Sequence, residues 1–285
     1  MSAFTLILQA PCLTAHALNA VHTLAGGSHV ARLNDTAARI FAVDPTARAA
    51  VVAYCEDARI DYAYLNAEAQ LSDYGLLVSD MDSTLIEIEC IDEIAALYGI
   101  KAQVAAITER SMAGDIDFAT SLTQRVALLA GLEESALARV YDEHLTLMPG
   151  TERLIARLRQ VGIKTLLVSG GFTYFTDRLK TQLGLDGAVG NQLEIIDGRL
   201  TGRLIGPLIN AQAKADHLIL WRERLGLRRN QTLAIGDGAN DLCMLAEAGL
   251  GIGVHPKPRV YQAAALSLRF VGLDGILHLF GESSP

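Results

Sequence analysis

Two clusters of carboxylates carry the clearest chemical signal in this chain. The run DMDST at residues 80–84 directly follows the apolar stretch Leu76–Ser79, and the run GDGAND at 236–241 follows a second apolar stretch. Carboxylates held close together at the ends of buried strands repel one another. A hard divalent cation with oxygen ligands would neutralise them. The pattern therefore predicts a Mg²⁺ site suited to phosphoryl chemistry.

The first run contains a possible nucleophile and a possible acid. Asp80 lies at the strand end, where its carboxylate could attack phosphorus. Asp82 faces the same way if the chain stays extended, so it could protonate the leaving oxygen. That division of roles requires Asp82 to hold a proton while Asp80 is ionised. In the second run, Asp237 and Asp241 would complete the cation site. Taken alone, each run also fits an Asp-rich turn or a helix cap.

Two further segments could bind the phosphoryl group. Ser169–Gly171 follows the next buried strand, and its hydroxyl and backbone N–H groups could cradle a phosphate. Lys214, at the start of an amphipathic stretch, could neutralise phosphate charge. Neither signal is specific alone, because Ser-Gly-Gly is common in turns and a lysine at a helix start is usually solvated.

The elements that must position these residues are those of an α/β fold with a parallel sheet. Continuous apolar runs are typical of parallel strands that are covered on both faces, and amphipathic stretches separate them here. Ligands bind such sheets outside the carboxyl ends of the strands, where the acid clusters would lie. Asp197-Gly198 predicts a hairpin turn. The expected strands are Leu76–Ser79, Thr165–Ser169, Thr232–Ile235 and Leu250–Val254, and the expected helices are Thr151–Val161, Tyr174–Leu183, Ala213–Leu225 and Asp241–Ala248.

The chain divides into three predicted parts. Residues 91–148 contain four helical segments broken by glycines, which predicts a helical cap inserted into the core and able to act as a lid. The core would comprise residues 74–90 and 149–285. Residues 1–73 show a βα rhythm without an acid cluster, which predicts a small α+β domain.

Composition and net charge argue against some kinds of binding partner and favour others. The net charge of −8 and the pI near 5.4 argue against a nucleic acid or an anionic membrane as partner. The sequence lacks an apolar stretch long enough to span a membrane and a visible secretory signal, so we expect a cytoplasmic protein acting on a small molecule. The four scattered cysteines are interpreted as reduced and mostly buried thiols. An apolar content of 51% would allow a homodimer.

In combination, these segments resemble a known family. DxDST, a Ser-Gly-Gly after the next strand, a downstream lysine and GDGxND occur in the order found in the haloacid dehalogenase superfamily of aspartate-nucleophile phosphatases. More narrowly, residues 75–260 resemble the phosphoserine phosphatases, since the first run continues through Glu89 into IDEIA at 91–95. Phe118 and Arg125 also fit the helical cap of that family.

The resemblance implies a Rossmann-like core and hydrolysis of O-phospho-L-serine to serine and phosphate, the last step of serine biosynthesis. Asp80 would form an aspartyl-phosphate, with Asp82 as general acid and later general base. Mg²⁺ would be held by Asp80, the backbone carbonyl of Asp82 and Asp237, with Asp241 supporting through water. Bacterial relatives often carry a regulatory ACT-like domain, and the rhythm of residues 1–73 permits one.

The resemblance also implies roles for the remaining site residues. Glu89 would pair with the substrate ammonium group and Arg125 with its carboxylate. The residues expected to hold the phosphate are Ser169, Gly170, Lys214 and Asn240, and those expected to close the lid are Met112 and Phe118. A phosphotransferase acting on another hydroxyl, such as that of homoserine, would use the same residues, and a phosphomutase or a non-catalytic binding protein are further alternatives.

Overall fold

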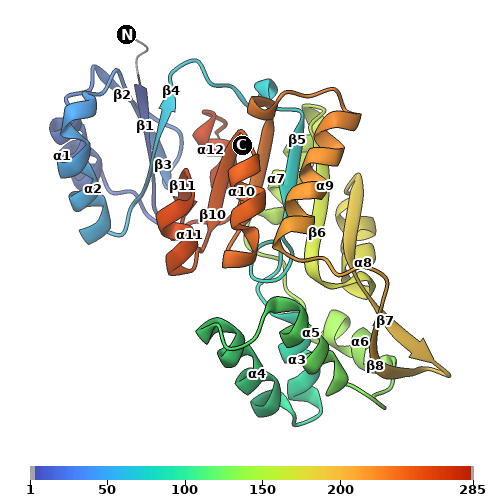
Figure 1. Ribbon diagram of the computed structural model, residues 1–285. Helices are drawn as coiled ribbons and strands as arrows, with labels where there is room; N and C mark the ends of the chain where they lie inside the picture. Colours follow the sequence, from blue (N-terminus) through green and yellow to red (C-terminus); the bar gives the residue numbers. More distant parts are fainter. Residues whose placement is uncertain (1–3, 284–285) are drawn as a thin grey trace.

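The structure is a computed structural model that describes residues 4–283, and these form two sheets (Figure 1). The smaller sheet has the order β2-β3-β1-β4 and is antiparallel throughout. Its βαββαβ chain order is typical of ferredoxin-like modules, which are one kind of small α+β domain. Its elements are β1 (Phe4–Gln9), α1 (Ala15–Ala25), β2 (His29–Arg32), β3 (Ala37–Phe41), η1 (Pro45–Ala47), α2 (Arg48–Asp57) and β4 (Asp61–Asn66), and η2 (Leu71–Asp73) leads on to the core.

The smaller sheet packs on the core with the face that its own helices leave open. Leu6 and Leu8 of β1 lie in the cluster under α1 and α2, whereas Ile7 between them belongs to the hydrophobic cluster of the core. This is the alternation of side chains along a strand. Buried Asp61 adds a polar link, since its Oδ2 accepts the backbone N–H groups of Arg269 and Phe270, each at 2.9 Å.

The larger sheet has seven strands in the order β11-β10-β9-β5-β6-β7-β8. Its pairs are parallel except for β7 and β8, so the predicted parallel α/β sheet is confirmed. The strands are β5 (Leu76–Ser79), β6 (Lys164–Phe172), β7 (Gly187–Ile196), β8 (Arg199–Ile205), β9 (Thr232–Gly236), β10 (Leu250–Val254) and β11 (Leu266–Leu268).

Helices cover both faces of this sheet, which explains the continuous apolar character of its strands. In β5, Leu76 and Val78 pack toward one set of helices and Leu77 packs toward the other. Each of these side chains contributes about 1.5–3 kcal/mol when fully buried. The first set is α9 (Ala211–Arg224), α10 (Leu242–Glu247) and α11 (Pro258–Ala263), and the second is α7 (Thr151–Gln160), α8 (Thr173–Leu183) and α12 (Gly275–Leu279), with η4 (Arg229–Gln231) before β9.

The segment between β5 and α7 is helical, as predicted, and lies beyond the carboxyl ends of the strands (Figure 1). Asp117 caps α5 by accepting the backbone N–H of Thr120 at 2.7 Å, and Gly114 ends α4 with a left-handed conformation (φ +87°). The helices of this cap are α3 (Cys90–Leu97), α4 (Lys101–Ala113), α5 (Phe118–Ala127), α6 (Ser135–Arg139) and the π-helical turn η3 (Val140–His144).

The β7–β8 hairpin reaches from the core to the cap. Its turn is the predicted one, with positive φ at Asp197 (51°) and Gly198 (73°). Leu200 of β8 accepts the backbone N–H of Gly131 at 2.8 Å and donates its own N–H to Leu132 at 2.8 Å. The hairpin therefore braces the cap, a contact that was not predicted from the sequence.

The four cysteines are free thiols, but the prediction that most of them are buried is wrong for two. Cys55 and Cys90 are buried in hydrophobic clusters, whereas Cys12 and Cys243 are exposed. Exposure follows from position, because Cys12 lies in the loop after β1 and Cys243 lies on the solvent side of α10.

Within residues 4–283, no helix is long and apolar enough to cross a membrane.

Candidate active site

A cavity of about 800 Å³ lies between the carboxyl ends of the central strands and the cap. It brings together most of the residues singled out from the sequence, although Asp80 and Asn240, for example, are 160 residues apart in the chain. The predicted residues that line it are Asp80, Asp82, Glu89, Met112, Phe118, Arg125, Ser169, Gly170, Asp237 and Asn240. Lys214 and Asp241 are not part of the lining.

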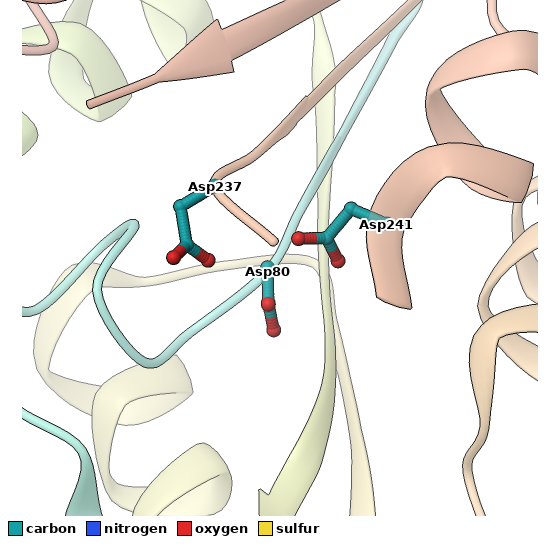
Figure 2. A group of neighbouring side chains, drawn as sticks. All are labelled: Asp80, Asp237 and Asp241. Atoms are coloured by element: carbon teal, nitrogen blue, oxygen red, sulfur yellow. The ribbon is translucent and has the colours of Figure 1, made fainter. Parts of the chain in front are cut away.

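Three buried carboxylates converge at the base of this cavity (Figure 2). Asp80 follows β5, Asp237 follows β9, and Asp241 ends η5 (Ala239–Asp241) at the start of α10. One oxygen of each lies within 4.8 Å of the others. Gly236 permits this approach, because a Cβ there would lie 2.5 Å from Cγ of Asp241. An all-oxygen, anionic donor set of this kind fits a hard divalent cation such as Mg²⁺.

Lys214 lies behind Asp80 rather than facing the cavity. Its side chain is 1% exposed, and its Nζ lies 2.7 Å from Asp80 Oδ1 and 2.7 Å from Asp241 Oδ1. Burial alone would lower the pKa of Lys214, but the two carboxylates outweigh it and raise that pKa. Burial, followed by the charge of Asp80, raises the pKa of Asp241 to about 7. The ammonium group therefore balances the charge of Asp80.

Asp82 meets the electrostatic requirement for a proton donor. Its Oδ1 accepts the backbone N–H of Cys90 at 3.1 Å. Burial, followed by the nearby charge of Glu89, raises the pKa of Asp82 to about 8. Gly171 leaves room for this side chain, since a Cβ at Gly171 would lie 2.8 Å from Asp82 Oδ2. A raised pKa of this kind favours a protonated Asp82 at neutral pH, as the role of proton donor requires.

The Ser169–Gly171 turn is fixed by a side chain that sequence reasoning missed. Buried Asn191 of β7 donates from Nδ2 to the carbonyl of Gly170 at 2.8 Å, and its Oδ1 accepts the backbone N–H of Ile209 at 2.9 Å. Ser169 Oγ accepts the N–H of Gly171 at 2.8 Å. No motif surrounds Asn191, and the residue lies outside the strands expected from the sequence, so no local signal marked it.

Glu89 and Arg125 face the cavity from the cap side. Glu89 precedes α3, and its Oε1 accepts a hydrogen bond from Ser83 Oγ at 2.9 Å. Arg125 lies on α5, and its Nε donates to the carbonyl of Ser121 at 3.4 Å. No ion pair of Arg125 is found within residues 4–283, so its terminal N–H groups are available to a carboxylate in the cavity. Phe118 of the same helix reaches the core, because its ring lies 3.2 Å from the position of a Cβ on Gly170.

Lys257 lines the cavity although it was not predicted as a site residue. Its Nζ lies 2.9 Å from Asp237 Oδ2 and 3.7 Å from Glu89 Oε1. It follows β10, so it lies at the same edge of the sheet as the acid clusters. The rule that located those clusters would also have located Lys257 if it had been applied to the strand Leu250–Val254.

Family models and a curated protein match large parts of this chain. The model of the haloacid dehalogenase-like hydrolases matches residues 74–249, and a model described as a domain of unknown function (DUF4072) matches residues 6–51. A curated phosphoserine phosphatase from Vibrio cholerae is 48% identical over 218 residues, which are 76% of this chain and 66% of that protein.

Two solved structures extend the comparison. A crystal structure of a probable phosphoserine phosphatase from Vibrio cholerae in unliganded form is 39% identical, with a TM-score of 0.82 over 98% of this chain and 86% of that one. A phospho-aspartyl intermediate analogue of phosphoserine phosphatase is 36% identical, with a TM-score of 0.68 over 72% of this chain and 98% of that one. The chain belongs to the haloacid dehalogenase-like hydrolases and, among these, to the phosphoserine phosphatases.

Proposed function

We propose that this chain hydrolyses O-phospho-L-serine to L-serine and phosphate through an aspartyl-phosphate on Asp80. The observation that carries the proposal is one cavity with two chemically different ends. Asp80, paired with a buried ammonium group, lies at the base, and Glu89 and Arg125 lie toward the cap. A phosphorylated zwitterion matches this arrangement of charges, with its phosphate at the first end and its amino acid part at the second.

In the first step, an oxygen of Asp80 attacks phosphorus while the bond from phosphorus to the serine oxygen breaks. Asp82 gives its proton to the departing oxygen, which its raised pKa permits. In the second step, Asp82, now a carboxylate, takes a proton from a water molecule that attacks phosphorus, and the bond between Asp80 and phosphorus breaks. Ser169, Gly170 and Asn240 line the cavity where they would hold the phosphate oxygens.

A divalent cation would be held by Asp80 and Asp237, together with the backbone carbonyl of Asp82 and, through water, Asp241. When bound, Mg²⁺ would supply charge neutralisation for the phosphoryl oxygens. Lys214, fixed between Asp80 and Asp241, would keep the nucleophile oriented. The proposal places the catalytic core in residues 74–90 and 149–285, the cap in 91–148 and a regulatory module in 1–73, within a cytoplasmic enzyme that completes serine biosynthesis.

Phosphate release from three closely matched esters tests the substrate assignment. L-Phosphoserine is compared with 3-phosphoglycerate, which has a hydroxyl in place of the ammonium group, and with O-phosphoethanolamine, which lacks the carboxylate. We expect Mg²⁺-dependent release with a strong preference for L-phosphoserine. Equal rates on all three would refute the roles of Glu89 and Arg125. Transfer to added homoserine in place of phosphate release would identify a phosphotransferase.

A further inference from the structure

Lys257 contacts two carboxylates to which the proposed function assigns different ligands. Its Nζ lies 2.9 Å from Asp237 Oδ2, in the group of acids suited to the divalent cation. It also lies 3.7 Å from Oε1 of Glu89, the acid assigned to the substrate ammonium group. One ammonium group therefore occupies a position where each ligand would bring positive charge.

The Lys257 side chain can leave this position, whereas its backbone is fixed. The side chain is 54% exposed, in contrast to the 1% exposed Lys214. A flexible four-carbon stem of this kind can turn its amine into solvent. The backbone N–H of Lys257 donates to the carbonyl of Asp237 at 2.9 Å, and Lys257 directly precedes α11. Displacement would therefore be a rotation of the side chain alone.

On this geometry, and taking the proposed function as given, we propose that Lys257 is an internal competitor displaced by both Mg²⁺ and the substrate ammonium group. Each ligand brings a positive charge into contact with an acid that Lys257 holds, and like charges at that distance repel. Once one ligand has displaced the amine, the second binds without having to do so. Lys257 thereby makes the binding of metal and of aminated substrate mutually favourable.

Calorimetric titration of the full chain with Mg²⁺, with and without L-serine, measures this coupling directly. L-Serine carries the ammonium and carboxylate groups but has no phosphate that could itself bind the metal. L-Glycerate, with a hydroxyl in place of the ammonium group, is the matched ligand control. We expect L-serine to tighten Mg²⁺ binding about two- to fivefold, the range of a half-exposed ion pair, and L-glycerate to leave it unchanged.

The variants separate competition from a general charge effect. In Lys257→Gln, Mg²⁺ alone should bind more tightly by about the same factor, and the effect of L-serine should disappear. Lys257→Arg keeps the charge and should keep the coupling. Arg259→Gln removes one positive charge two residues away, where no ion pair to Asp237 or Glu89 is found within residues 4–283, and should also keep the coupling.

Two results would overturn the inference. Coupling that persists in Lys257→Gln would show that the amine does not compete, and weaker Mg²⁺ binding in that variant would show that Lys257 instead holds Asp237 in place for the metal. These readouts do not depend on turnover. Absence of phosphate release from L-phosphoserine by the wild type would refute the proposed function and leave the binding result intact.

Discussion

Replacement of Lys214 by methionine should destabilise the catalytic core strongly. The Lys214 side chain is 1% exposed, and its Nζ lies 2.7 Å from an oxygen of Asp80 and 2.7 Å from an oxygen of Asp241. Methionine fills most of the space of the aliphatic stem but leaves two buried carboxylates facing each other without a cation. Removing one partner of a buried ion pair costs about 3–5 kcal/mol. We therefore expect the free energy of unfolding of the metal-free protein to fall by about that amount.

Lys164→Met is the matched control for this prediction. Lys164 Nζ also lies 2.7 Å from its partner, Asp186, but the lysine side chain is 50% exposed. An exposed pair contributes about 0.2–1 kcal/mol, so this variant should lose little. Urea unfolding with EDTA present, followed by circular dichroism, compares both variants with the wild type. Mg²⁺ should restore part of the loss in Lys214→Met, and equal small losses in both variants would refute this electrostatic account.

Three further predictions address specificity, pH and space in the cavity. Arg125→Ala should lower kcat/KM for L-phosphoserine about 100-fold by removing a charge-assisted pair, while steady-state rates on O-phosphoethanolamine should change little; equal losses would contradict its role. In the wild type, kcat/KM should fall as the pH rises through about 8, because Asp82 must keep its proton to act as an acid, and a profile still rising beyond that pH would exclude it. Gly171→Ala should lower kcat about tenfold, since a Cβ would lie 2.8 Å from both Asp82 Oδ2 and Met81 Cε. Gly99→Ala, where nothing lies within 4 Å, should leave kcat unchanged even if its positive φ lowers the melting temperature, and a similar fall in kcat in both variants would contradict the steric argument.

The parts of the fold that could be predicted depend on local signals. β5 and β10 begin and end at the predicted residues, because their apolar runs are short, continuous and bounded by polar residues or glycine. The hairpin at Asp197-Gly198 follows from a dipeptide that adopts positive φ readily. The cavity residues were predicted by the same reasoning, since parallel strands end at one edge of the sheet and bring Asp80, Ser169 and Asp237 together.

The parts that could not be predicted depend on contacts between distant segments. Asn191 donates a hydrogen bond to the carbonyl of Gly170, which lies 21 residues earlier in the chain. The carbonyl of Leu200 accepts the backbone N–H of Gly131, which lies 69 residues earlier. No local sequence pattern marks either contact. Lys214 was expected to face the phosphate, but its orientation is set by two acids that converge only in the folded chain. Lys257 follows the predicted strand Leu250–Val254, so its place at the sheet edge was predictable, but its contacts with Asp237 and Glu89 form only in the folded chain.

The central claim is that Asp80 carries the phosphoryl group while L-phosphoserine is hydrolysed. The most direct test is a rapid acid quench during turnover of L-phosphoserine radiolabelled in its phosphoryl group, followed by peptide mapping of the protein. We predict an acid-stable, alkali-labile acyl-phosphate on the peptide that contains Asp80, and loss of both label and turnover in a folded Asp80→Asn variant. Turnover without label on Asp80, or normal turnover in Asp80→Asn, would contradict the mechanism.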